Sequence, residues 1–80
     1  MTPGKIYEVD FKYKSYLTFD VYCKEKYHAF PNKTSFICLK YSVNDRGWCE
    51  AKVIMQDGII GDMLYMKGSN LYRAIKRIKK

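Results

Sequence analysis

The sequence contains no long apolar run. Its longest clearly apolar stretch is Phe36–Leu39, which is far too short to cross a bilayer. Residues 1–5 also lack the apolar segment of an export signal. We therefore expect neither membrane insertion nor export, and we predict a cytoplasmic protein with no membrane partner.

Cysteine is scarce. Three cysteines, an odd number without a secretory signal, favour reduced thiols over a disulfide framework. Cys23, His28, Cys38 and Cys49 are possible zinc ligands, but the four, nine and ten residues between neighbours form no Cys-x-x-Cys or His-x-x-x-His pair. We expect no metal and no other cofactor.

Motifs for catalysis are also lacking. His28 has no carboxylate or nucleophile close to it in its segment, and the serines do not lie in a nucleophile elbow. Residues 3–5, Pro-Gly-Lys, lack the glycine spacing of a phosphate-binding loop. These absences favour a binding protein over an enzyme.

Acidic residues are few, and basic residues concentrate at the C-terminus. The chain has 15 Lys and Arg against 8 Asp and Glu, a net charge of +7. Residues 73–80 hold five bases and no acid, which leaves 10 bases against 8 acids elsewhere. Such a basic end favours nucleic acid or an acidic protein surface as partner, although solubility alone would also account for it.

The C-terminal pattern predicts one amphipathic helix over residues 70–79, capped by Ser69 or Asn70. Leu71, Ala74 and Ile75, followed by Ile78, would share its apolar stripe. The bases on this helix are the ones expected to contact a partner: Arg73, Lys76, Arg77, Lys79 and Lys80.

Alternation and turn residues predict five strands, at about 6–13, 17–23, 35–43, 48–56 and 59–67. Residues 24–33 are expected to be irregular. No linker or repeat divides the chain, so residues 1–80 should form a single domain. The expected fold class is α+β, a small antiparallel sheet or an SH3- or OB-like barrel of about five strands with the basic helix.

The turn at Asn44–Gly47 predicts a hairpin that places Tyr41 opposite Ala51 and Leu39 opposite Val53. In this register Cys38 and Cys49 point to opposite faces. Cys23 and Cys49 would then be core residues, with Cys38 on the outer face beside Ile54.

Two further hairpins are expected. A loop at residues 14–16 would pair residues 6–13 with 17–23. A two-residue turn at Asp57–Gly58, followed by a bulge at Gly61, would place Val53 opposite Met63 and Ala51 opposite Tyr65.

Thirteen aromatic residues exceed what a small core needs. The register places Tyr22, Phe36 and Trp48 on the outer face, with Lys40 and Lys52. Such a surface can stack bases while the lysines hold phosphates, and it equally suits a protein interface. The aromatic residues expected to point inward are Tyr7, Phe11, Tyr13, Phe19, Tyr41 and Tyr65.

These features predict a small non-enzymatic binding protein, with nucleic acid as the first hypothesis for its partner. The alternative is a phage-type effector that inhibits a host protein in the host cytoplasm, because lysine outnumbers arginine twelve to three, as AT-rich codon usage would produce. A third hypothesis is a nucleotide-like ligand bound in an aromatic pocket. The sequence gives no indication of the oligomeric state.

Overall fold

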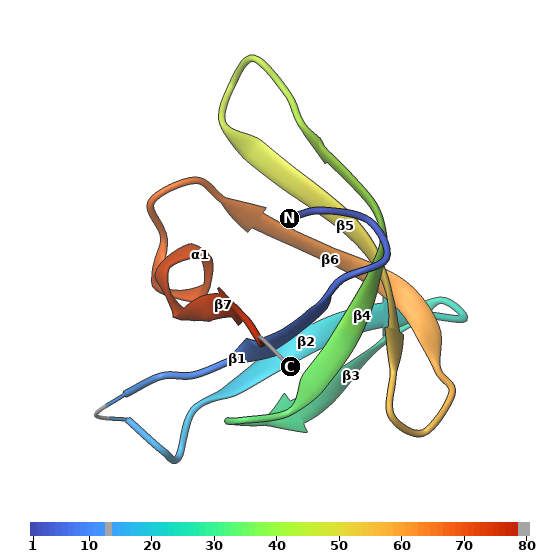
Figure 1. Cartoon of the computed structure of the whole chain (residues 1–80), viewed down its shortest axis with the longest axis vertical. Helices are drawn as coiled ribbons and strands as arrows, with labels where there is room; N and C mark the ends of the chain where they lie inside the picture. The colour runs from blue at the N-terminus through green and yellow to red at the C-terminus, as the bar shows by residue number, and fades with distance from the viewer. Residues whose placement is uncertain (13, 79–80) are drawn as a thin grey trace.

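The computed structural model of the protein describes residues 1–12 and 14–78. Its described strands form one antiparallel sheet in the order β3-β2-β6-β5-β4-β1-β7, which curls into a half-barrel (Figure 1). The short helix α1 lies against β1 and β6. The elements are β1 (Ile6–Val9), β2 (Thr18–Cys23), β3 (Lys26–Pro31), β4 (Ser35–Val43), β5 (Trp48–Met55), β6 (Ile60–Met66), α1 (Asn70–Ala74) and β7 (Ile75–Arg77).

The core lies on the concave side of the sheet, where alternate side chains of the strands meet. Tyr7, Phe19 and Tyr65 are buried there as predicted, and Phe11 and Tyr41 are half-buried against it. Tyr13, also predicted to point inward, lies outside the described residues. The buried hydrophobic residues are Tyr7, Val9, Phe19, Val21, Phe36, Cys38, Cys49, Ala51, Val53, Met55, Met63, Tyr65 and Ala74.

The β4–β5 hairpin has the predicted register near its turn and a different one beyond it. Tyr41 pairs with Ala51, and Gly47 has the expected positive φ of 84°. An irregularity between Cys38 and Lys40 then shifts the pairing by one residue, so that Cys38, not Leu39, lies opposite Val53. Because successive strand residues face opposite sides, this bulge turns Cys38 inward and corrects the predicted outer position.

The predicted pairing of residues 6–13 with 17–23 is wrong. β1 ends at Val9 and pairs with β4 and β7, whereas β2 pairs with β3. Residues 26–31, expected to be irregular, form that third strand. The tight turn uses Lys24 and Glu25, both with positive φ, and no glycine marks it in the sequence.

The β5–β6 turn also differs from the prediction. Met55 N donates to Ile59 O, so three residues form the loop, with Gly58 at φ 88°. Val53 consequently lies opposite Gly61, and Ala51 opposite Met63. The difference is two residues, which preserves the alternation, so the side chains predicted to point inward still do so.

The prediction of a long C-terminal helix is also wrong. α1 ends at Ala74, and residues 75–77 continue as β7 along the edge of β1, with Val9 opposite Ile75. The predicted cap at Ser69 is confirmed, since its hydroxyl accepts a hydrogen bond from Tyr72 N at 3.2 Å. The unfilled edge of β1 supplies backbone partners that a helical chain could not use. Lys79 and Lys80 lie outside the described residues.

No helix in the described part of the chain has the length and apolar character needed to cross a membrane.

Candidate binding groove

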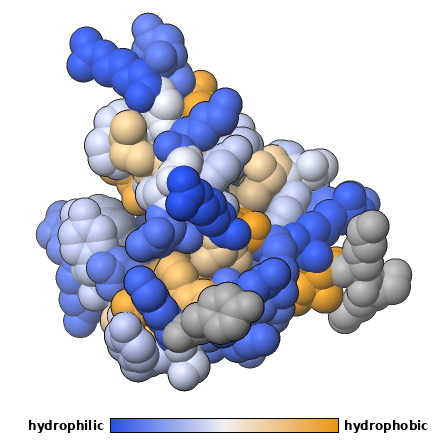
Figure 2. All heavy atoms as spheres, turned by 90° about the vertical axis from the view of Figure 1, so that its left-hand side faces the viewer, coloured by the Kyte–Doolittle hydropathy of each residue, from blue (hydrophilic) through white to orange (hydrophobic). Residues whose placement is uncertain are grey.

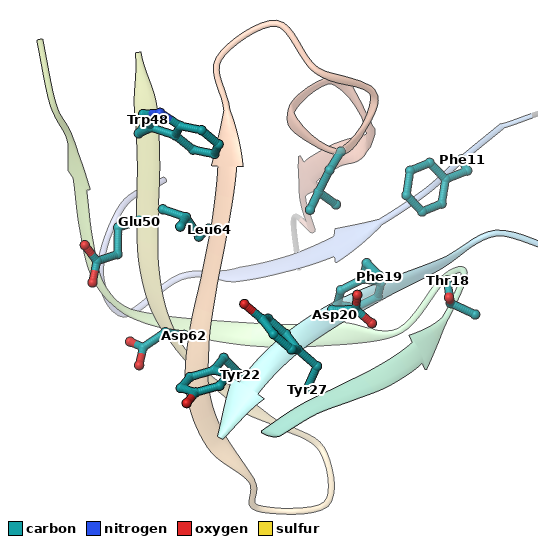
Figure 3. A pocket seen from close by; sticks show the side chains of 11 residues that line it. Phe11, Thr18, Phe19, Asp20, Tyr22, Tyr27, Trp48, Glu50, Asp62 and Leu64 are labelled. Atoms are coloured by element: carbon teal, nitrogen blue, oxygen red, sulfur yellow. The ribbon is translucent and has the colours of Figure 1, made fainter. Parts of the chain in front are cut away.

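A groove opens where β2 and β6 cross. The two strands pair at Tyr22 and Asp62 and then diverge, which separates the β2–β3 ribbon from the β5–β6 ribbon (Figure 3). Gly61 permits the crossing, because a Cβ at this position would lie 2.6 Å from both the Tyr22 carbonyl oxygen and Val21 Cγ1. A residue without a side chain is therefore needed at the apex of the groove.

The groove has a volume of about 680 Å³, within the range of ligand pockets of roughly 300–1,000 Å³. Buried Phe19 and half-buried Phe11 and Leu71 contribute apolar side chains to it. Its full lining is Phe11, Thr18, Phe19, Asp20, Tyr22, Tyr27, Trp48, Glu50, Asp62, Leu64 and Leu71. These residues come from β2, β3, β5, β6, α1 and the segment after β1, so the groove forms only when the sheet is assembled.

Three exposed aromatic rings lie at two ends of the groove (Figure 3). Trp48, 41% exposed, lies at one end on β5. Tyr22 and Tyr27, 40% and 70% exposed, lie at the other end on β2 and β3, with ring centroids 5.0 Å apart and planes at 58°. Trp48 and Tyr22 thus occupy the outer surface predicted for them, and both line the same groove.

The charge of the groove is opposite to that of the whole chain. Asp20, Glu50 and Asp62 line it, and none of its described lining residues is basic. Within residues 1–12 and 14–78, the ion pairs involve the carboxylates of Glu8 and Asp10 instead. Three of the chain's eight acids therefore converge on one aromatic groove.

Phe36 does not belong to a surface site. It is 2% exposed, stacks on Tyr7 with a centroid distance of 6.2 Å and tilts against Phe19 at 6.4 Å. The β4 bulge, which reverses the facing of residues 36–38, is the physical reason. Phe36 is therefore a core residue, and truncating it would cost about 3–5 kcal/mol of stability.

Lys40 and Lys52 are exposed, as predicted, and lie directly opposite each other on β4 and β5. Lys52 is also opposite Asp62 in the β5–β6 pairing. The two lysines therefore flank the acidic groove and do not line it.

The basic C-terminal residues are separated by the change from helix to strand. Arg73 is exposed on α1, and Arg77 is exposed at the end of β7. Lys76 Nζ instead contacts Asp10 Oδ2 at 2.6 Å and Glu8 Oε1 at 4.0 Å. The hydrogen bond to Asp10 raises the pKa of Lys76, so this cation is neutralised by the protein's own carboxylates.

On the side of the molecule that Figure 2 presents, hydrophilic side chains are spread widely, and apolar side chains are visible between them. This face therefore mixes polar and apolar side chains, as ordinary protein surfaces do.

Cys38 and Cys49 are both buried on the core side, and Cys23 is half-buried. The predicted opposite facing of Cys38 and Cys49 is wrong because of the same β4 bulge. Burial raises the pKa of the Cys38 thiol, which lowers its reactivity. Within the described residues, His, Cys, Asp and Glu form no group of three or more suited to a metal ion.

Sequence reasoning missed the three groove carboxylates and Tyr27. Alternation along β5 places Glu50 on the same face as Trp48, and alternation along β2 does the same for Asp20 and Tyr22. This local signal was available. The convergence of the two strand faces depends on the crossing at Gly61, which no local pattern specifies.

No protein-family model, curated protein or solved structure matches the chain. A functional proposal therefore depends on the geometry and charge of the groove.

Proposed function

We propose that the chain is a non-enzymatic protein-interaction module that binds a positively charged segment of a partner protein in the aromatic–acidic groove. One observation carries the proposal. In a chain with a net charge of +7, the described lining of this groove has three acids and no base. Complementary charge directs partner choice at interfaces, so a cationic segment is favoured here.

The aromatic rings support the same function. Tryptophan and tyrosine are enriched at protein interfaces, and their ring faces attract ammonium and guanidinium groups. Trp48, Tyr22 and Tyr27 present such faces beside the carboxylates.

The phage-type inhibitor hypothesis is one form of this proposal, in which the partner is a host protein. The charge it requires of that partner differs from the sequence-based expectation, however. The basic tail predicted an acidic partner surface, whereas the groove favours a basic one. A nucleotide-like ligand is disfavoured, because its phosphate groups would be repelled by the carboxylates of Asp20, Glu50 and Asp62.

Nucleic-acid binding remains a second candidate because of Lys40 and Lys52. These two exposed lysines lie directly opposite each other on neighbouring strands, so one bound phosphate could contact both cations. Exposed Arg73 and Arg77 would add contacts. In this case affinity for single-stranded DNA or RNA would fall steeply as salt is raised, and Lys40→Gln with Lys52→Gln would weaken it.

A fluorescence titration tests the leading proposal, because Trp48 is the only tryptophan and lies in the groove. Ten-residue peptides of equal length, one basic and one acidic, are added to the folded protein. We expect the basic peptide to change the Trp48 emission and the acidic peptide to leave it unchanged.

Charge-removing variants make the titration specific. Glu50→Gln together with Asp62→Asn should weaken binding of the basic peptide about five- to thirtyfold, from roughly 0.5–1 kcal/mol for each charge contact. Glu25→Gln removes the same kind of charge from the exposed β2–β3 turn, outside the groove lining, and should leave the affinity unchanged. An equal loss in both proteins would contradict binding in the groove.

A further inference from the structure

Resting on this proposed function, we infer that the groove recognises arginine, in preference to lysine, on an extended segment carrying two such residues. The inference comes from the way each aromatic end of the groove combines a ring with a carboxylate.

One end combines Tyr22 with Asp62. These two residues lie directly opposite each other in the β2–β6 pairing, and the Tyr27 ring lies against Tyr22. Opposed residues in an antiparallel pair have Cβ atoms about 5 Å apart. A planar cation stacked on the tyrosine face would therefore have a carboxylate within reach of its edge.

The other end combines Trp48 with Glu50. The two residues are separated by one position on β5, so their side chains leave the same face, about 7 Å apart along the strand. Figure 3 shows both side chains on the β5 side of the groove. Leu64, opposite Glu50 on β6, gives this end an apolar neighbour. Each end thus combines a ring with an acidic group, although in Figure 3 the Glu50 carboxylate points away from the Trp48 ring.

Arginine matches this arrangement better than lysine does. Its guanidinium is planar, stacks on aromatic faces and forms two parallel hydrogen bonds to a carboxylate, whereas the lysine ammonium is a compact, strongly hydrated point charge. Guanidinium is also more weakly hydrated than ammonium, so it loses less hydration free energy on entering a half-open groove. A lysine ammonium would neutralise the carboxylate charge but would not stack on the ring faces as a planar guanidinium does.

The separation of the two ends suits an extended partner. Trp48 lies opposite Met66, and Asp62 is four residues from Met66 on β6, a distance of about 13 Å along the strand. Four residues of a partner in strand conformation span about 13 Å and bring its side chains back to the same face. Two arginines four positions apart would therefore reach both ends.

Three matched peptides test the inference. Each has nine residues, with two identical side chains four positions apart in a glycine–serine background. The side chains are arginine, lysine or citrulline, which is planar like arginine but uncharged. We expect the arginine peptide to bind about tenfold more tightly than the lysine peptide, and the citrulline peptide to bind more weakly than both, by calorimetry or Trp48 emission.

Two variants test whether the Tyr22 ring produces the preference for arginine. Tyr22→Leu keeps an apolar side chain but removes the ring, and it should reduce arginine affinity about threefold to tenfold while changing lysine affinity less. Tyr16→Leu is the matched control, because Tyr16 is exposed and does not line the groove. Both tyrosines are exposed, so circular dichroism and thermal melting should show folded proteins.

The outcomes separate the two proposals. Equal binding of the arginine and lysine peptides would overturn the arginine preference and leave the cationic-partner function standing. If neither peptide binds, both proposals fail. If a single-stranded oligonucleotide changes Trp48 emission and the arginine peptide does not, the groove serves nucleic acid and both proposals fail.

Discussion

At the scale of single residues, Asp10 connects the start of the chain to its end. Its side chain is 6% exposed, and its Oδ2 contacts Lys76 Nζ at 2.6 Å and Lys33 Nζ at 3.4 Å. Its backbone N–H donates to Ala74 O at 2.8 Å. Among the described residues, Oδ1 is buried without a hydrogen-bond partner. A buried carboxylate with paired cations is costly to disturb, so this residue anchors the junction of α1 and β7.

The pH dependence of stability follows from Asp10. The hydrogen bond from Lys76, with the charge of Lys33, lowers the pKa of Asp10 despite burial, which acts to raise it. A carboxylate with a lowered folded pKa stabilises the protein above its ordinary pKa of about 4, and this stability is lost as pH falls through the folded value. Asp10→Asn should therefore lower the Tm at pH 7, and the deficit relative to wild type should shrink as pH falls below about 4.

Thermal melts between pH 2 and pH 8 measure this effect. Asp45→Asn is the matched control, because Asp45 is exposed in the β4–β5 turn and should leave the Tm unchanged. A deficit in Asp10→Asn that stays constant down to pH 2 would show that the carboxylate charge is not what stabilises the junction.

At the scale of elements, the crossing of β2 over β6 shapes the groove. A methyl group at Gly61 would lie 2.6 Å from the Tyr22 carbonyl oxygen, and a backbone atom cannot move aside as the end of a flexible side chain can. Gly61→Ala should therefore destabilise the protein by about 1–3 kcal/mol and also weaken peptide binding, since it separates the strands at the apex.

Urea unfolding and the Trp48 titration together test the role of Gly61. Ile60→Ala is a suitable comparison, because Ile60 is exposed on the same strand, lies outside the groove lining, and its truncation should change stability and binding little. Wild-type stability in Gly61→Ala would mean that β2 and β6 do not approach as closely as described.

The elements also show what local sequence can specify. The Asn44–Gly47 turn and the alternation along β4 and β5 predicted the hairpin near its turn, because a one-residue slip there would expose the apolar face. The bulge in β4 was not predictable in this way, since both faces carry apolar residues at positions 36–39. β7 depends on the free edge of β1, a partner nearly seventy residues away.

The candidate site was also predictable from the sequence only where local strand alternation determines it. Strand alternation placed Trp48 and Tyr22 on the outer surface and did so correctly. Among the predicted site residues on the described strands, Phe36 faces inward instead, because of the β4 bulge. The convergence of Asp20, Glu50 and Asp62 depends on three strands and a non-local crossing, so the sequence-based reading gave weight to the basic tail and overlooked the acidic groove.

At the scale of the whole molecule, two regions of opposite charge compete as the site of function. One is the acidic aromatic groove, and the other comprises the exposed cations of the outer sheet and the C-terminal segment, such as Lys40, Lys52 and Arg77. Their locations differ enough for one experiment on the intact chain to separate them.

That experiment is an NMR titration of the ¹⁵N-labelled chain with the two-arginine peptide. We predict that the largest shifts fall on the Trp48 indole N–H and on the backbone amides of Tyr22, Asp62 and Leu64, while those of Lys40 and Arg77 stay nearly unchanged. Shifts centred on Lys40, Lys52 and Arg77, or no shifts at millimolar peptide, would contradict the assignment of function to the groove.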